Sequence, residues 1–376
     1  MITPEENAEK EVVLRWGEEL AEDLGITLEN KIKTITLQEF SKLKLPQDRW
    51  LIKDILPREG FVIIASPSGE KKTWVALSMA GAIANGKDFL GHDGFKTSQG
   101  QVLYIDEEMS DTELQRRVNL LGLGDTVENI YLSRKNNLNF NEREDEQIEE
   151  LFEFVEKHDI KAIFIDTFRS VAGGLKEDKA EDIRAYLDKF RPFKNNGVVV
   201  VFLDHCRKPA PREGSIPKKE QLLGSQDKLA SVEALFMIKS EEESGDILVY
   251  PRKSRNGKEY PPFRIQMNED CDDHGESTSI ELIYKGKLEE KEMALDGAKR
   301  AVISILSSSK GMKRQEIITA LKEVDKMGTR NVSSAIRILE DNKEIILTKV
   351  GRENFYEIGG GQSTEDIFSE FDSMDN

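Results

Sequence analysis

The sequence predicts an α/β fold: a mostly parallel sheet covered by helices on both faces, followed by a small helical domain with a β-hairpin. Short apolar segments alternate with longer amphipathic ones, which is the pattern of strands buried on both faces. The expected strands are Phe61–Ala65, Val102–Asp106, Lys161–Asp166 and Val198–His205, and the expected helices are Thr73–Asn85, Glu144–Glu156 and Ala180–Phe193. Two later segments, Leu235–Ser240 and Ile247–Ser254, are expected to add antiparallel strands.

Length and charge restrict the class of protein. The 376 residues suit two or three domains, and the net charge of −17 argues against a protein that simply coats nucleic acid. We expect an acidic helical leader and linker, the main α/β domain, a second linker, the small helical domain and a disordered acidic tail, at 1–47, 48–268, 269–294, 295–360 and 361–376.

Membrane and disulfide features are missing from the sequence. No window approaches eighteen apolar residues, and the acidic start does not resemble a secretory signal. Cys206 and Cys271 are too few for a disulfide framework or a zinc cluster, so we expect a reducing, cytoplasmic compartment.

The loop between the first strand and the first helix resembles a Walker A phosphate loop. Its last two residues, Lys72 and Thr73, supply the lysine for the phosphate oxygens and the hydroxyl for Mg²⁺. The two glycine positions of the motif hold Ser66 and Lys71, which puts ATP turnover in doubt. An ordinary strand-to-helix loop with two surface lysines is the alternative. The residues expected at the nucleotide are Ser66, Pro67, Ser68, Gly69, Glu70, Lys71, Lys72, Thr73 and Trp74.

Acidic and histidine side chains follow the next three predicted strands. Glu107 and Glu108 lie beyond one strand, Asp166 ends another, and Asp204-His205 ends a third. The carboxyl ends of parallel strands face the ligand crevice of an open sheet, where a carboxylate can activate water or hold Mg²⁺.

Together these segments resemble the RecA-like P-loop ATPases of the RepA hexameric helicase family, close kin of DnaB-type replicative helicases. The resemblance covers about residues 48–268 and includes RWLIKDILPREGFVIIASPSGEKKT, VLYIDEEMSDTELQRRV, IFIDTFRSV, LDHCRKP and LLGSQ. It implies ATP and Mg²⁺ as ligands and a hexameric ring. It also implies that Glu108 is the catalytic glutamate, with Glu107 as its rival, and that Asp166 is the Walker B aspartate.

Three more roles are implied by the resemblance. His205 matches a γ-phosphate sensor, and its alternative is a hydrogen-bonded buried histidine. Lys253 and Arg255, in PRKSRNGKEY, match residues that reach the nucleotide of a neighbouring subunit. A basic hairpin turn at Asn256-Gly257 is the alternative for this segment.

DNA contacts are expected in two places. Loops at Arg169–Asp178 and Arg207–Lys219 are candidates for phosphate contacts, through Arg207, Lys208, Lys218 and Lys219, or else are solvated loops. Residues 295–360 resemble bacterial DNA-binding winged helices, with three helices at Gly297–Ser307, Lys313–Val324 and Thr329–Asn342 and a following hairpin. The third helix offers Arg330, Asn331, Ser334 and Arg337 to the major groove, and the wing offers Lys349 and Arg352. The alternative is a winged helix that contacts protein.

The sequence thus predicts an ATP-driven helicase or translocase that works on single-stranded or forked DNA as a homo-oligomer. A nucleotide-binding switch or loader with little hydrolysis is the second hypothesis, and a DNA-binding regulator on an ATPase scaffold is the third. The acidic tail is a candidate peptide for a protein partner.

Overall fold

The computed structural model describes residues 35–43, 48–124, 129–141, 146–207, 216–222, 226–241, 244–309, 311–324, 327–350 and 353–359. Most of the predicted leader and all of the predicted tail lie outside these residues. Within them, a short helix α3 (Leu37–Phe40) precedes a two-stranded sheet of β1 (Trp50–Ile52) and β2 (Leu56–Pro57). None of the described helices is long and apolar enough to cross a membrane.

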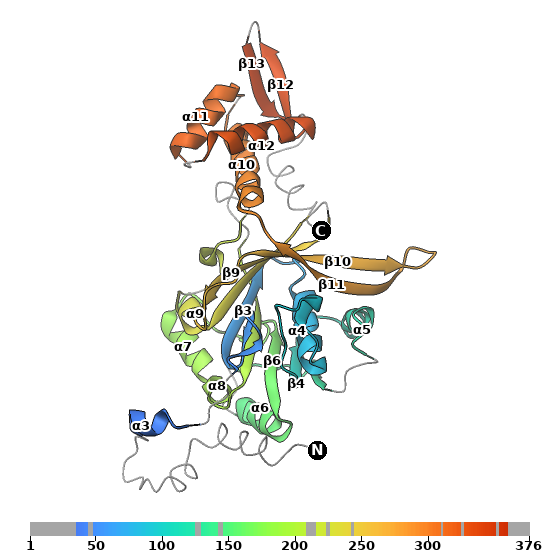
Figure 1. The fold of residues 1–376 in the computed structure, drawn as a ribbon, viewed down its shortest axis with the longest axis vertical. Helices are drawn as coiled ribbons and strands as arrows, with labels where there is room; N and C mark the ends of the chain where they lie inside the picture. The colour runs from blue at the N-terminus through green and yellow to red at the C-terminus, as the bar shows by residue number, and fades with distance from the viewer. Residues whose placement is uncertain are drawn as a thin grey trace.

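A nine-stranded sheet forms the centre of the described core, in the order β11-β10-β9-β8-β3-β7-β6-β4-β5 (Figure 1). Parallel pairing joins β8, β3, β7, β6, β4 and β5 to one another in this order. Their bounds are Ala234–Ser240, Gly60–Ser66, Val199–His205, Ile160–Asp166, Gln101–Asp106 and Ile130–Arg134. The four apolar segments predicted as strands are therefore neighbours, with β7 between β3 and β6.

Strand β8 departs from the antiparallel pairing expected for Leu235–Ser240. It pairs parallel with β3, with Val62 opposite Ala234, and antiparallel with β9 (Ile247–Ser254) on its other side. The helix α9 (Gln226–Ser231) precedes β8, and parallel pairing needs such a crossover connection. The antiparallel expectation for this strand was correct for its pairing with β9 and wrong for its pairing with β3.

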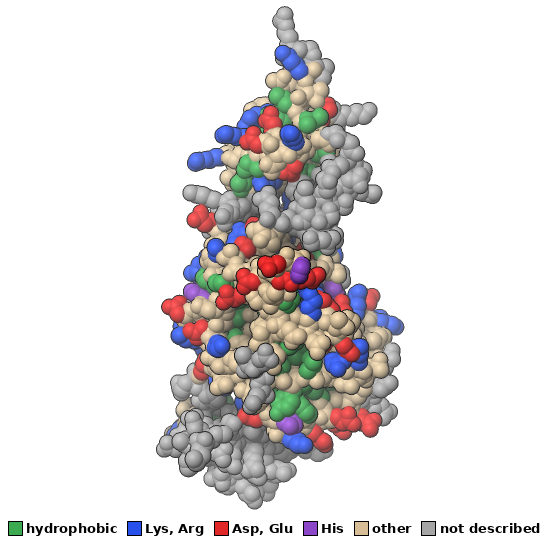
Figure 2. All heavy atoms as spheres, turned by 90° about the vertical axis from the view of Figure 1, so that its right-hand side faces the viewer, with side chains coloured by type: hydrophobic (Ala, Val, Ile, Leu, Met, Phe, Trp, Pro, Cys, Tyr) green, Lys and Arg blue, Asp and Glu red, His purple; other side chains and the backbone are tan. Residues whose placement is uncertain are grey.

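The predicted linker at 269–294 was also wrong, because the sheet continues through it. Strands β10 (Phe263–Cys271) and β11 (Ser277–Lys287) form a long antiparallel hairpin, which projects from the core in Figure 1. The base of the hairpin is buried at Phe263, Ile265, Ile280 and Leu282, whereas its far end is exposed on both faces. Backbone pairing continues there with polar side-chain bonds such as Ser279 Oγ to Asp270 Oδ2 at 2.7 Å, so the polar composition of this end resembles that of a loop. Figure 2 shows the acidic side chains gathered around this end of the hairpin.

Helices cover both faces of the sheet, as Figure 1 shows. Alternate residues of β3 explain this: Val62 and Ile64 pack in one apolar cluster, and Phe61 and Ile63 pack in the other. The first cluster includes α4 (Lys72–Asn85), η1 (Phe89–Gly91) and α5 (Asp111–Leu120). The second includes α6 (Glu146–Lys157), α7 (Ala180–Asp188) and α8 (Arg191–Asn195). The single helix expected at Ala180–Phe193 is divided here, and Pro192 stands in the first turn of α8, where it needs no hydrogen-bond partner.

The C-terminal residues form their own apolar cluster. The elements are α10 (Glu290–Ser307), α11 (Arg314–Val324), α12 (Thr329–Asp341) and the antiparallel pair β12 (Ile345–Val350) and β13 (Glu353–Ile358). Helix α12 buries Val332, Ala335, Ile336 and Leu339 at helical spacing, and these residues pack on α10 and α11. Three helices and a hairpin therefore follow in the order that the sequence suggests.

Candidate functional site

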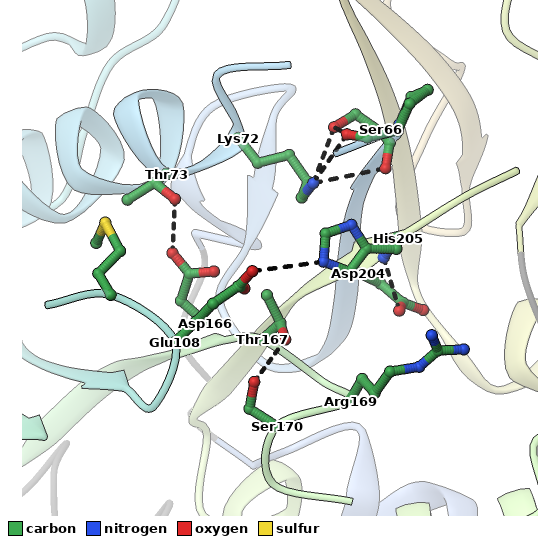
Figure 3. A network of polar contacts seen from close by, with 12 residues as sticks. Ser66, Lys72, Thr73, Glu108, Asp166, Thr167, Arg169, Ser170, Asp204 and His205 are labelled. Atoms are coloured by element: carbon green, nitrogen blue, oxygen red, sulfur yellow. Dashed lines mark hydrogen bonds and ion pairs between the residues drawn. The ribbon is translucent and has the colours of Figure 1, made fainter. Parts of the chain in front are cut away.

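The polar residues that end the central strands meet at one edge of the sheet (Figure 3). Ser66 at the end of β3 pairs with His205 at the end of β7, and Asp106 at the end of β4 pairs with Asp166 at the end of β6. Parallel strands bring their carboxyl ends to the same side, which explains how Ser66 and His205, far apart in the sequence, converge. We call this the carboxyl edge; the opposite side, where the parallel strands begin, is the amino edge.

The loop from Ser66 to Lys71 curls at the N-terminus of α4. Gly69 has a φ of 91° and Lys71 has φ 59° and ψ 19°, so two left-handed residues lie close together. Turns of this kind direct backbone N–H groups inward and, with the positive end of a helix, favour an anion. The loop is thus a candidate phosphate cradle at the N-terminus of α4 despite its two missing glycines, although the Lys71 N–H donates to Gly69 O at 3.0 Å within the loop.

Lys72 lies buried beneath this loop. Its Nζ donates to Ser66 Oγ at 3.0 Å and to Pro67 O at 3.2 Å. Burial lowers the pKa of Lys72, while Asp166 and Glu108 act in the opposite direction. A buried cation held by oxygens of its own loop can exchange these partners for phosphate oxygens.

Thr73 and Asp166 form the second part of the cluster. Thr73 Oγ1 donates to Asp166 Oδ2 at 2.7 Å, and the Tyr104 hydroxyl donates to the same oxygen at 3.1 Å. Burial raises the pKa of Asp166 to about 6. A hydroxyl beside a buried carboxylate fits Mg²⁺, which takes one or two protein oxygens and completes its shell with phosphates and waters. Among the described residues, no group of three or more His, Cys, Asp or Glu side chains that could hold a metal is found.

The structure separates the two adjacent glutamates. Glu108 Oε1 lies 3.8 Å from His205 Nε2 at the carboxyl edge (Figure 3). This contact lowers the pKa of Glu108, so the deprotonated carboxylate is favoured. Glu107 turns away, because its carboxylate accepts the backbone N–H groups of Asn136 and Asn137 at 3.0 and 3.2 Å. Asp106 Oδ1 accepts the backbone N–H groups of Glu108 and Met109, which fixes the turn that carries Glu108.

A buried lysine that the sequence did not predict contacts a residue at the carboxyl edge. Lys228 Nζ, on α9, donates to Asp204 Oδ2 and to Glu177 Oε2, each at 2.7 Å, and lies 3.9 Å from the centre of the Phe168 ring. Asp204 in turn accepts the backbone N–H of His205 at 2.8 Å. A lysine on a short helix usually lies in solvent, so composition and spacing carry no signal for this cluster.

Lys253 and Arg255 do not join the site of their own chain. Lys253 pairs with Leu235 near the beginning of β8, which places it toward the amino edge. Its Nζ donates to the backbone oxygens of Leu229 and Ala230 at 2.5 and 3.1 Å, and Arg255 donates to Ala230 O as well. Burial lowers the pKa of Lys253 to about 8, and Arg255 acts in the same direction.

The residues expected at DNA are spread over three regions. Arg207, Lys218 and Lys219 are exposed near the end of β7 and around η2 (Lys219–Gln221). Lys208 and Arg352 lie outside the described residues. Of the residues expected at DNA in the C-terminal domain, Arg330, Arg337 and Lys349 are exposed, and Asn331 and Ser334 are half-buried.

Residues 29–211 match a family model described as AAA domain. Among solved structures, the chain is similar to a KaiC-like protein from the hyperthermophilic archaeon Pyrococcus horikoshii, with 14% identity, a TM-score of 0.40, and coverage of 63% of this chain and 94% of that chain. No match is found among curated proteins. The AAA match spans the phosphate loop, Glu108, Asp166 and His205. Together with the mostly parallel sheet, this match to an AAA domain supports a nucleotide-binding P-loop ATPase, and such ATPases typically use Mg²⁺.

Proposed function

We propose that this protein is an ATP-dependent motor of the helicase or translocase type, which hydrolyses ATP between copies of itself and acts on DNA. The observation that carries the proposal is the convergence of Lys72, Thr73, Glu108, Asp166 and His205 at the carboxyl edge. These groups supply a cation that can bind the phosphates, two ligands for Mg²⁺, a base and a polar sensor.

Each of these side chains has a role that fits its position. Lys72 would move from Ser66 to the β- and γ-phosphate oxygens, and Thr73 and Asp166 would hold Mg²⁺, which neutralises developing phosphate charge. Glu108 would orient the attacking water and accept its proton. His205, 3.8 Å from Glu108, is placed to respond to the γ-phosphate.

The proposed site is completed by a second copy of the chain. Lys253 and Arg255 lie toward the amino edge of their own sheet, away from their own phosphate loop. A neighbouring copy could present them to the nucleotide, where a cation stabilises charge that develops on the transferred phosphoryl group. Because hydrolysis would then need subunit contact, a closed ring is the expected assembly.

DNA binding is proposed for the C-terminal domain and for the loops at the carboxyl edge. The buried face of α12 points into its own cluster, so the opposite face presents Arg330 and Arg337, as a recognition helix of a winged helix would. Lys349 on β12 is exposed and would contact DNA phosphate, as would the exposed Lys218 and Lys219 beside η2.

A nucleotide-dependent switch or loader is the second candidate. It is favoured by Lys71 at a Walker A glycine position and by the hold of Ser66 and Pro67 on Lys72. In that case ATP binds and turns over slowly, and the bound state controls assembly or DNA docking.

The test compares ATP hydrolysis, with and without single-stranded DNA, among wild type, Glu108→Gln and Glu107→Gln. General-base catalysis contributes about 10²–10⁴-fold, so Glu108→Gln should lose about that much turnover and still bind ATP. Glu107→Gln is the matched control and should keep most of its turnover. DNA-stimulated hydrolysis supports the motor, ATP binding with negligible turnover supports the switch, and equal losses in both variants contradict the assigned base.

A further inference from the structure

Two side chains of the phosphate loop point away from the phosphate cradle toward a neighbouring turn. Lys71 Nζ donates to Gly245 O at 2.7 Å, and the buried carboxylate of Glu70 accepts the backbone N–H of Ser240. Ser240 ends β8 and Gly245 precedes β9, so both contacts are made with the β8–β9 turn, residues 240–246. The structure describes 240–241 and 244–246 of this turn.

The β8–β9 turn is fixed from its other side by β10. Arg264 donates to both carboxylate oxygens of Glu241, at 3.0 Å for the Nη2 contact, and its Nη1 lies 3.3 Å from Asp246 Oδ2. Backbone bonds between Glu241 and Asp246 and between Gly245 and Glu241 close the turn at 2.8 and 2.9 Å. The turn is thus held between the hairpin strand β10 and the phosphate loop.

The backbone of Lys71 explains why such a hold is useful. At φ 59° and ψ 19°, Lys71 adopts the left-handed conformation that glycine takes freely and other residues take at a cost. A Walker A loop normally has glycine at this position. Here the bond from Lys71 to Gly245 and the bond from Ser240 to Glu70 oppose that cost and hold the loop in its curled shape.

We propose that Glu70 and Lys71 are positioning residues, which brace the phosphate loop against the β8–β9 turn and replace the conformational freedom of the missing glycine. Arg264 is the outer anchor of this brace, although it does not contact the loop. The brace deepens the proposed function, because its purpose is a loop that is shaped for phosphate before the nucleotide arrives.

The test compares Lys71→Met, Lys71→Gly and Arg264→Gln with wild type. Lys71→Met removes the bond and keeps the unfavourable backbone, so the Kd for MgATP should rise about 5- to 30-fold, the range that corresponds to the cost of a left-handed residue. Lys71→Gly removes the bond and the cost together, so its Kd should rise clearly less than that of Lys71→Met. Arg264→Gln should weaken MgATP binding in the wild-type background and not in the Lys71→Gly background.

A phosphate-binding role for Lys71 gives a different pattern and would overturn the brace. Both Lys71→Met and Lys71→Gly would then weaken MgATP binding equally, because both lose the cation, and Arg264→Gln would have no effect. A second readout needs no nucleotide: amide hydrogen exchange over residues 67–72 should be faster in Lys71→Met and Arg264→Gln than in wild type. Unchanged exchange in both variants contradicts the brace. Failure of wild type to bind MgATP, together with faster exchange in the variants, contradicts the proposed function and leaves the brace supported.

Discussion

The two edges of the central sheet carry different groups of charged side chains. The carboxyl edge gathers Lys72, Asp166 and Glu108, which can bind phosphate and Mg²⁺ and activate water. Toward the amino edge lie Lys253 and Arg255, two cations held by backbone oxygens of α9. The parallel sheet keeps these two groups apart within one chain. Under the proposed function, a working site takes two copies arranged head to tail.

Helix α9 contacts both edges. Its residues Leu229 and Ala230 accept bonds from Lys253 and Arg255, and its Lys228 binds Asp204 next to His205. Movement of these two cations toward a neighbour would therefore free backbone oxygens on the helix whose lysine supports His205. The three predictions below test this difference between the edges, in order of expected effect.

The largest effect should come from Arg255→Ala. A cation supplied by a neighbouring subunit is worth about 10³–10⁵-fold in turnover, so ATP hydrolysis should fall by about 10³-fold while ATP binding is kept. A similar loss of turnover is expected for Glu108→Gln, although Glu108 lies at the carboxyl edge and Arg255 lies toward the amino edge. Steady-state hydrolysis and equilibrium nucleotide binding measure the two quantities separately.

Mixing the two variants is the matched control for Arg255→Ala. A Glu108→Gln copy still offers Arg255, and an Arg255→Ala copy still offers Glu108, so mixed assemblies contain some complete sites. Random mixing in equal amounts should restore about a quarter of the wild-type turnover, because half of the copies supply each group. A mixture as inactive as its components would show that both residues act in the same subunit.

A smaller effect is expected at Lys228, which joins α9 to the carboxyl edge. The Lys228 side chain is 0% exposed, and Lys228→Met leaves Asp204 and Glu177 without their shared cation. Removal of one partner from a buried ion pair costs about 3–5 kcal/mol, so the free energy of unfolding should fall by about that amount. Denaturant unfolding of the full chain measures the loss.

Arg184→Met is the control for Lys228→Met. Arg184 bonds Asp227 on the same helix α9 at 2.8 Å, but its side chain is 65% exposed. Exposed pairs contribute about 0–1 kcal/mol, so this variant should unfold close to wild type. Equal losses in the two variants would mean that burial of Lys228 adds no stability.

The sequence predicts the carboxyl edge well because its chemistry follows from strand order. Asp166 and His205 each end an apolar strand, and strands of a parallel sheet end on the same side. The choice between Glu107 and Glu108 depends instead on backbone N–H groups after β5, a strand whose side chains are half-buried or exposed and whose apolar run is only three residues long. Lys228 resembles a solvated helix lysine until the fold places two carboxylates and an aromatic ring around it.

The last prediction concerns thiol labelling. It compares Cys206 at the carboxyl edge with Cys271 on the exposed hairpin. Cys206 follows His205, its backbone N–H bonds Ser66 O at 2.9 Å, and burial raises the pKa of its thiol to about 12. Cys271 is exposed at the end of β10. A rise from 9.0 to about 12 reduces the reactive thiolate about a thousandfold near pH 8, and burial blocks the reagent as well. A thiol reagent should therefore label one site quickly in wild type and none in Cys271→Ser until the chain unfolds. Quick labelling of native Cys271→Ser would show that the carboxyl edge opens around Cys206, and a closed, pre-shaped phosphate loop would then not describe the nucleotide-free protein.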